Sequence, residues 1–204
     1  MVRVNRENLT AAAYIACWKI VRYLPHPVAA WLFERGADYA SDNGAGMEQL
    51  RQNLSRVVGP EKVTRELVRD SMRSYMRYWL EAFRLPAIHA DPSLHEQLLA
   101  GMRGKEYSDA SIASGRGVIF ALPHSGNWDM AGVFCVKHYG GFTTVAERLK
   151  PEVLFDAFVD YRESLGFTVL PLTGASSSPF PRLKDTLEHG GVVCLLAERD
   201  LTRT

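Results

Sequence analysis

Two residues of types that move protons lie five positions apart in the middle of the chain, His124 and Asp129. They follow the apolar run Val118–Leu122, and the small residues Ser125 and Gly126 lie between them. An imidazole that is oriented by a carboxylate is the minimum equipment for deprotonating a hydroxyl group near neutral pH. The pair therefore predicts general-base chemistry at the end of a strand.

The spacing of this pair limits how the two side chains can meet. On one α-helix, residues five positions apart point about 140° away from each other, so they do not touch. They can meet if the chain turns after His124 and Asn127 caps a new helix whose first turn carries Asp129. Two simpler interpretations stay open: His124 as a buried, satisfied strand-end histidine, and Asp129 as an acid that complements the helix dipole.

Strands and helices are expected to alternate after Gly115. Nearly continuous apolar runs predict strands over residues 118–122, 142–146, 167–172 and 192–197, with helices over residues 127–139, 151–165 and 180–189. This order predicts right-handed crossovers and an α/β fold, a mostly parallel sheet with helices on both faces.

Ligands of such sheets bind beyond the carboxyl ends of the strands. His124 follows the first predicted strand, and the pair Glu147 and Arg148 follows the second. Glu198 and Arg199 follow the fourth. The polar groups of three strands are therefore expected to converge on one edge, although Glu198 and Arg199 are also compatible with an ordinary surface ion pair.

The first half of the chain is predicted to be helical. Its helices are expected over residues 8–24, 28–40 and 47–58, from Pro60 to just before Pro86, over 92–99, and from a cap at Ser108 to Gly115. The sequence thus predicts an N-terminal helical region, residues 1–114, packed with an α/β catalytic core, residues 115–204, in one structural domain. Because the chain stops just past the last strand, the core is expected to be incomplete at its C-terminus.

The composition of the chain bears on which ligands it binds, on the state of its cysteines and on where it is located. The 204 residues are 47% hydrophobic and 23% charged, and a net charge of +1 offers no general field for nucleic acid. The three cysteines, Cys17, Cys135 and Cys194, lie far apart in apolar sequence and are expected to be reduced core thiols. Neither a signal peptide nor an apolar run of about 18 residues is present, so we expect a location in the cytosol or on the cytosolic face of a membrane.

Two features of the helical region bear on membranes. Its first two helices are rich in aromatic residues, with Trp18 and Trp31 among them, and suit an interfacial position. In the long helix, four arginines recur every fourth residue and form one stripe that suits an anionic lipid surface: Arg65, Arg69, Arg73 and Arg77. The alternative is a core-packed helix with a solvated basic face.

The block from Pro123 to Asp129 resembles the block of His, four residues and Asp of the glycerolipid and lysophospholipid acyltransferases. The surrounding sequence is closer to the bacterial lipid A acyltransferases, and within them it most resembles the actinobacterial phosphatidylinositol mannoside acyltransferases. Three further blocks support this resemblance: Val145–Lys150, Tyr161–Gly166 and Leu196–Asp200. It implies that about a third of a family-length chain lies beyond Thr204. Glu198-Arg199-Asp200 departs from the Asp-Gln-Asp form of the lipid A enzymes, which disfavours a lipid A acceptor.

The resemblance implies transfer of a fatty acyl group from a thioester, with palmitoyl-CoA as the expected donor, to a mannose hydroxyl of phosphatidylinositol mannoside. His124 would be the general base, Asp129 would orient its ring, and Glu198 would be a second carboxylate near it. Substrate-binding roles fall on Asn127, Glu147, Arg148, Arg162 and Arg199. Backbone N–H groups after Asn127 would stabilise the oxyanion. No metal or cofactor is implied, and an anionic membrane surface is the expected partner.

Other readings of these features stay open. They are a lipid A-type or lysophospholipid acyltransferase, a non-catalytic lipid-binding protein of the same fold, and a soluble thioesterase. Arg162 could instead be a solvated helix-end cation. Residues 174–178, Gly-Ala-Ser-Ser-Ser, lack the lysine of a P-loop and are interpreted as a linker or flexible lid. The chain has no G-x-S-x-G and no G-x-G-x-x-G motif, which disfavours an α/β-hydrolase and a dinucleotide enzyme.

Overall fold

The computed structural model describes residues 15–197 except residues 17, 149, 175 and 176. The described residues form two compact parts, one of residues 18–84 and one from residue 85 onward. Helices fill the first part, and the strands begin only at Val118. The domain boundary predicted at residue 115 stays a prediction.

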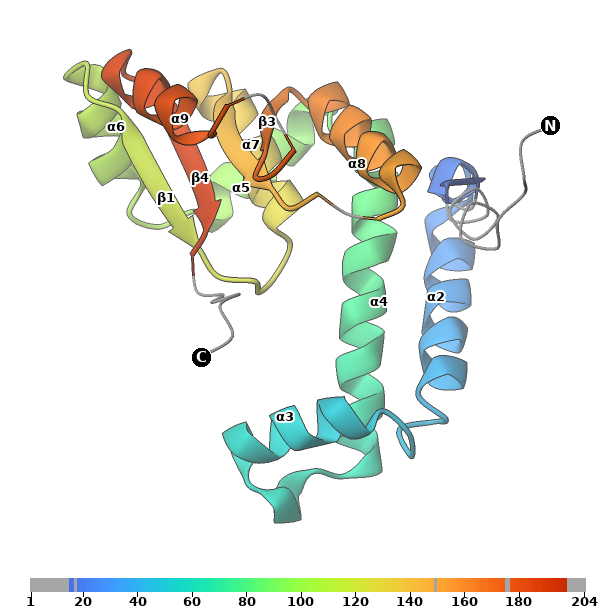
Figure 1. The fold of residues 1–204 in the computed structure, drawn as a ribbon. Coiled ribbons are helices and arrows are strands. Elements are labelled where there is room, and N and C mark those ends of the chain that lie inside the picture. Colours follow the sequence, from blue (N-terminus) through green and yellow to red (C-terminus); the bar gives the residue numbers. More distant parts are fainter. Residues whose placement is uncertain (1–14, 17, 149, 175–176, 198–204) are drawn as a thin grey trace. The chain divides into compact units, whose positions relative to one another are not determined.

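Helices α2 and α4 pair within residues 18–84 (Figure 1). Helix α2 spans His26–Ala40, α3 spans Glu48–Val58, the short 3-10 helix η1 spans Pro60–Lys62, and α4 spans Arg65–Ile88. Ala29 and Ala37 of α2 are fully buried, and Gly36 faces Met76 of α4, from which a Cβ at Gly36 would lie at the ordinary contact distance of 3.8 Å. Asp38 adds a bidentate ion pair with Arg73, at 2.7 and 2.6 Å.

Helix α4 differs from the helix predicted between Pro60 and Pro86. Pro60 starts only the turn η1, and α4 begins at Arg65 after Thr64, whose Oγ1 accepts from the backbone N–H of Leu67 at 3.1 Å. A proline lacks a backbone donor but keeps a helical φ. The helix accordingly passes through Pro86 and ends at Ile88.

The part from residue 85 onward contains a four-stranded sheet of order β1-β4-β2-β3, in which every pairing is parallel. The strands are β1 Val118–Leu122, β2 Phe142–Ala146, β3 Phe167–Pro171 and β4 Val192–Leu196. The helices are α5 Pro92–Gly101, α6 Lys105–Ala113, α7 Trp128–Tyr139, α8 Glu152–Ser164 and α9 Phe180–Glu188. The α/β fold with a parallel sheet is confirmed.

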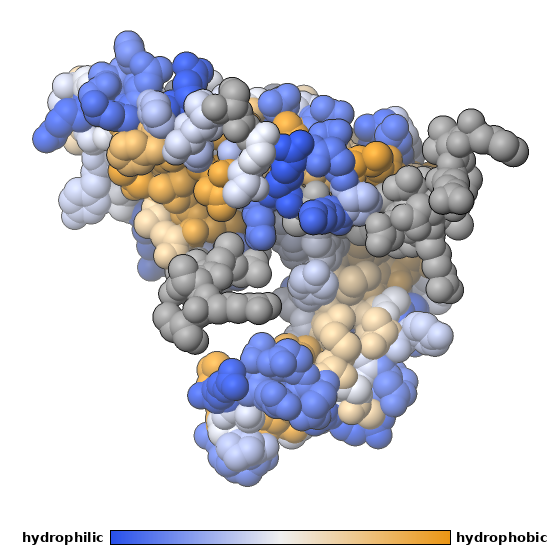
Figure 2. All heavy atoms as spheres, viewed as in Figure 1, coloured by the Kyte–Doolittle hydropathy of each residue, from blue (hydrophilic) through white to orange (hydrophobic). Residues whose placement is uncertain are grey.

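Helices cover both faces of this sheet. On one face α7 lies so close that a Cβ at Gly132 would come within 2.5 Å of the Phe167 ring, so only glycine fits there. On the other face Thr186 of α9 lies 3.1 Å from Thr143, oxygen to oxygen. Neighbouring residues of a strand point to opposite faces, and on edge strand β1 the alternation leaves Ile119 57% exposed. In Figure 2, hydrophobic surface lies over β1 and β4.

Two cysteines meet in the core between α7 and β4. The sulfur atoms of Cys135 and Cys194 lie 3.8 Å apart, and both residues are buried free thiols. The contact with Cys135, together with burial, raises the pKa of Cys194, so this thiol stays protonated. The prediction of reduced core thiols is confirmed for these two residues, and Cys17 lies outside the described residues.

Helix α6 begins four residues earlier than predicted. Gly104 precedes its first residue, and Ser108 is internal, where its Oγ meets Tyr139 at 2.7 Å instead of capping the helix. The next residue, Asp109, lies 3.1 Å from the Tyr139 hydroxyl and 2.9 Å from Nε2 of His138. A polar cluster therefore joins α6 to the end of α7.

Candidate functional site

The loop between β1 and α7 places His124 on the surface. His124 is exposed, so it is not the buried strand-end histidine of the simpler interpretation. Asn127 caps α7, because its side-chain oxygen accepts a hydrogen bond from the backbone N–H of Met130 at 3.1 Å. Asn127 and Asp129 lie where the sequence predicts them, at the cap and in the first turn of a new helix. The chain bends at His124 and Gly126, and the contact between His124 and Asp129 stays a prediction.

Asp129 is nearly inaccessible to solvent. It is 2% exposed, and a buried carboxylate is costly unless it is paired. Arg162 of α8 supplies the partner, with its Nε 3.3 Å from Oδ1 of Asp129. The position in the first turn of α7 adds the favourable end of the helix dipole. Both features partly offset the cost of burying this carboxylate.

Arg162 is itself enclosed by aromatic rings. The centre of its guanidinium lies 4.3 Å from the ring centroid of Trp128 and 5.8 Å from that of Phe158, and its side chain is 16% exposed. A planar cation between aromatic faces and a carboxylate is strongly restricted in orientation. Arg162 is therefore not the solvated helix-end cation of the alternative interpretation.

The carboxyl ends of the parallel strands meet at the edge where these residues lie. The backbone N–H of Ala197, just after β4, donates to the carbonyl of Leu122 at 3.1 Å. The backbone N–H of Leu172, just after β3, donates to the carbonyl of Ala146 at 2.8 Å. The loops that leave the sheet therefore start side by side in pairs. Glu198 and Arg199, which follow Ala197, lie outside the described residues.

Glu147 and Arg148 follow β2 at the same edge, and both are exposed. Arg148 contacts Glu152 through Nε at 3.0 Å and through Nη2, and its Nη1 donates to the carbonyl of Gly174 at 3.0 Å. The ion pair with Glu152 raises the pKa of Arg148 and lowers that of Glu152.

Three partners of these residues were not foreseen from the sequence: Trp128, Phe158 and Glu152. A spacing signal was present for one of them. Phe158 precedes Arg162 by four residues on α8, the spacing that brings side chains together on a helix face. Glu152 also follows Arg148 by four residues, but Arg148 lies before α8, so the helical spacing does not apply to this pair. For Trp128 the sequence shows only that it precedes Asp129, and this does not predict its contact with Arg162 of α8.

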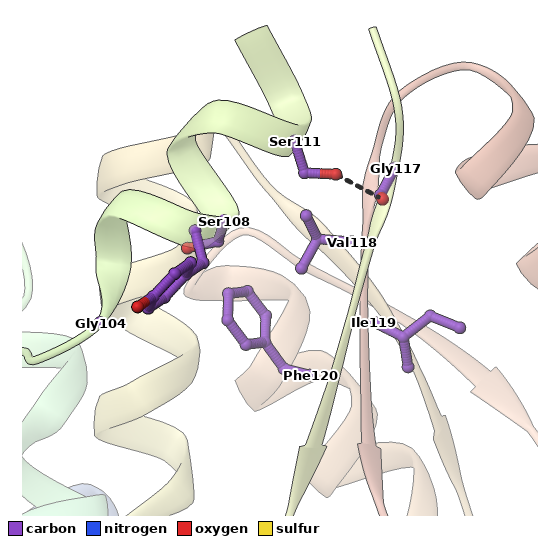
Figure 3. A pocket seen from close by; sticks show the side chains of 8 residues that line it. Gly104, Ser108, Ser111, Gly117, Val118, Ile119 and Phe120 are labelled. Carbon is purple, nitrogen blue, oxygen red and sulfur yellow. Dashed lines mark hydrogen bonds between the residues drawn. The ribbon is translucent and has the colours of Figure 1, made fainter. Parts of the chain in front are cut away.

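A shallow hollow lies at the other end of β1. It has a volume of about 380 Å³ and lies between α6 and the start of the strand, where Ser111 donates to the carbonyl of Gly117 (Figure 3). Phe120 and Val118 point to the side of α6, and Ile119 points away. Since the hollow adjoins the amino end of β1, it lies apart from the loop that carries His124.

Helix α2, within residues 18–84, has an exposed apolar face. Val28, Trp31, Leu32 and Tyr39 follow a helical spacing and are 47%, 56%, 46% and 89% exposed. Arg35 lies on the same face, 5.8 Å from the Trp31 ring centroid. Among the described residues, no helix is long and apolar enough to cross a bilayer.

The arginine stripe of α4 is only partly available to a ligand. Arg73 is bound to the buried Asp38, and this contact lowers the pKa of Asp38. Arg69 lies 3.5 Å from Asp70 and 3.7 Å from Glu66. Arg73 therefore matches neither the lipid-facing stripe nor a solvated basic face, because it pairs with Asp38 of α2.

Comparison with known proteins finds acyltransferases that match nearly the whole chain. The profile of the bacterial lipid A biosynthesis acyltransferases matches residues 2–204. The chain is 54% identical over 199 residues to the phosphatidylinositol mannoside acyltransferase of Mycolicibacterium smegmatis, covering 97% of this chain and 64% of that protein. It is 53% identical over 200 residues to the protein of the same name from Mycobacterium tuberculosis, covering 97% of this chain and 63% of that protein.

The chain thus spans somewhat less than two thirds of the length of these relatives. The matched region includes the loop of His124, the buried pair of Asp129 and Arg162, and all four strands of the parallel sheet. The chain belongs to the bacterial lipid A biosynthesis acyltransferase family.

Proposed function

We propose that this protein is an acyltransferase that moves a long-chain fatty acyl group from acyl-CoA to a mannose hydroxyl of phosphatidylinositol mannoside. The observation that carries the proposal is the arrangement of three residues: an exposed His124 just before α7, and a buried Asp129 paired with Arg162. The name of the two relatives supports the acceptor.

In this proposal His124 takes the proton of the acceptor hydroxyl as that oxygen attacks the thioester carbonyl. Asp129 orients the imidazole and stabilises its protonated form, as the aspartate of a serine protease triad does, but without a nucleophilic serine. The proton then passes to the departing CoA thiolate. An exposed base suits this role because both substrates must reach it.

Arg162 contributes by holding Asp129. Its contact with Oδ1 fixes one carboxylate oxygen, and the rings of Trp128 and Phe158 fix the guanidinium. We therefore assign Arg162 to positioning the carboxylate, whereas the resemblance alone suggested a contact with a substrate head group. Backbone N–H groups in the first turn of α7 are the proposed oxyanion donors.

The remaining site residues are proposed to serve the substrates. Glu198 would be a second carboxylate beside His124, and Glu147 and Arg199 would contact the donor or the acceptor from the loops after β2 and β4. Asn127 would act through the helix that it caps. Acyl-CoA, with palmitoyl-CoA as the expected donor, is a substrate in this scheme, and neither a metal nor a further cofactor is proposed.

The acceptor is a lipid, so we propose peripheral binding to the cytoplasmic face of an anionic membrane. The exposed face of α2 supports this, since Trp and Tyr favour the interface and an adjacent arginine favours anionic lipid. Arg73 is left out of this surface because it is bound to Asp38.

The test is a transfer assay with purified protein, palmitoyl-CoA and mannosylated phosphatidylinositol, with the product read by mass spectrometry. We expect an acylated mannolipid. Parallel reactions with a lipid A precursor and with lysophospholipid decide the acceptor class. Release of free fatty acid in place of acylated lipid would refute transfer and support a thioesterase.

A further inference from the structure

We infer that Arg148 is a positioning residue, a clasp that ties the loop after β2 to the loop after β3 at the rim of the proposed site. The inference deepens the proposed function and rests on it for its catalytic consequence. The clasp itself stands on contacts among three segments: the chain just after β2, the first residue of α8 and the chain just after β3.

The guanidinium of Arg148 contacts the other two segments simultaneously. Two of its nitrogens contact the carboxylate of Glu152, the first residue of α8, with Nε at 3.0 Å from Oε2. A third nitrogen, Nη1, donates to the carbonyl of Gly174 at 3.0 Å. The ring of Phe155, which is 8% exposed, lies 5.8 Å from the guanidinium carbon. The planar fork of arginine suits such a two-sided contact, whereas a lysine ammonium does not.

Gly174 is fitted to this contact. Its φ of +76° favours glycine, and a Cβ there would lie 2.2 Å from Nη1 of Arg148. A side chain at this position would therefore displace the guanidinium of Arg148 from the loop backbone.

The clasp acts where the two loops leave the sheet together. Ala146 pairs with Pro171 in the last register position of β2 and β3, and the N–H of Leu172 still donates to Ala146 at 2.8 Å. Arg148 makes the next connection outward. It thereby limits the independent movement of the segment that carries Glu147, which the proposed function places beside a substrate.

This assignment changes what Arg148 contributes to the reaction. The resemblance suggested direct substrate binding. In the structure, however, three nitrogens of the guanidinium already contact protein groups, the carboxylate of Glu152 and the carbonyl of Gly174. The two roles make opposite predictions for Glu152. If Arg148 bound substrate, removing its carboxylate partner would leave substrate affinity equal or better. If Arg148 is a clasp, removing either partner loosens the same loops.

The first test measures native-state hydrogen exchange at the Leu172 amide by NMR, in Arg148→Gln, Arg148→Lys and Glu152→Gln. We expect all three to accelerate this exchange about two- to fivefold, the range of a partly exposed ion pair. Lys184→Gln is the matched control, because Lys184 and Glu188 form another exposed ion pair of the same spacing, at 3.2 Å on α9. Unchanged exchange in Arg148→Gln would overturn the clasp, whether or not the protein is a transferase.

The second test is kinetic. Arg148→Gln and Glu152→Gln should lower kcat/KM by similar factors, and the double variant should lose no more than either single one, because both remove one connection. A raised KM in Arg148→Gln with an unchanged or lowered KM in Glu152→Gln would overturn the clasp in favour of direct substrate binding. Lack of transfer by the wild type would refute the proposed function, and the exchange result would still decide the clasp.

Discussion

Nε of Arg162 lies 3.3 Å from Oδ1 of Asp129, and this pair joins α8 to the first turn of α7. The carboxylate is 2% exposed and the arginine side chain 16%. In such a place a charge is tolerated because its partner is present. The same contact therefore holds the fold together and fixes the group that is proposed to orient the base.

Arg162→Met should reduce both stability and turnover. It leaves the buried carboxylate of Asp129 without this partner, and breaking such a pair typically costs about 3–5 kcal/mol. Urea unfolding measures the loss, and Arg182→Met is the control, because Arg182 pairs with Asp185 on the surface of α9 at 3.5 Å. That exposed pair should contribute less than about 1 kcal/mol. Equal losses in the two variants would contradict a special role for Arg162.

His124→Ala should lower turnover by about 10²–10⁴, the usual contribution of a general base, and leave the fold intact because His124 is exposed. The transfer assay measures the turnover, and circular dichroism shows whether the fold is intact. His189→Ala is a suitable control, since His189 is an exposed histidine that follows α9. Near wild-type turnover in His124→Ala would show that the base has been misassigned.

The sequence predicted the sheet well because its signals are local. Each strand is a short apolar run. β1 and β2 have the predicted bounds, and β3 and β4 each end one residue earlier than predicted. The cap at Asn127 was also predictable, because an N-cap depends on a residue type and its immediate neighbours. The same holds for Asp129 in the first turn of α7.

Contacts between distant segments were not predictable in this way. Asp129 and Arg162 are 33 positions apart, and Asp38 and Arg73 are 35 apart. The regular spacing of arginines on α4 suggested a lipid-facing stripe, yet Arg73 turns to a buried acid on α2. A charge pattern gives the face of a helix but not what that face packs against. The start of α6 was misplaced for a related reason, because Ser108 hydrogen-bonds to Tyr139 of another helix.

Asp109→Asn should remove an acid-sensitive part of the stability. Lys105 first, and then His138, lower the pKa of Asp109 from 3.8 to about 2. A carboxyl whose pKa is depressed by folding stabilises the folded state above its unfolded pKa, and this contribution is lost as pH falls through the folded value. Urea midpoints between pH 5 and pH 2 should therefore fall more steeply in the wild type than in Asp109→Asn. Parallel curves would contradict the depressed pKa.

The exposed face of α2 should control membrane binding. Trp31→Ala combined with Leu32→Ala should weaken binding to anionic liposomes about tenfold at both low and high salt, because the lost contribution is apolar. Sedimentation with liposomes gives the measurement. Val57→Ala is the control, because Val57 is an 81% exposed apolar residue on α3. Similar losses in both would show that general surface hydrophobicity, and not this face, drives binding.

Ser125→Ala should keep substantial activity, because we expect direct transfer without an acyl-enzyme. Ser125 is adjacent to His124 and is the obvious candidate nucleophile, but neighbouring residues at a strand end tend to point in different directions. The loop of Ser125 also lacks the G-x-S-x-G elbow that presents a nucleophilic serine. The acceptor hydroxyl can take its place beside the imidazole, and binding both substrates together supplies the proximity that a covalent step would give. Incubation with palmitoyl-CoA alone should therefore produce no burst of free CoA and no increase in the mass of the intact protein. A stoichiometric acyl group on Ser125 that chases into product would establish a ping-pong mechanism instead.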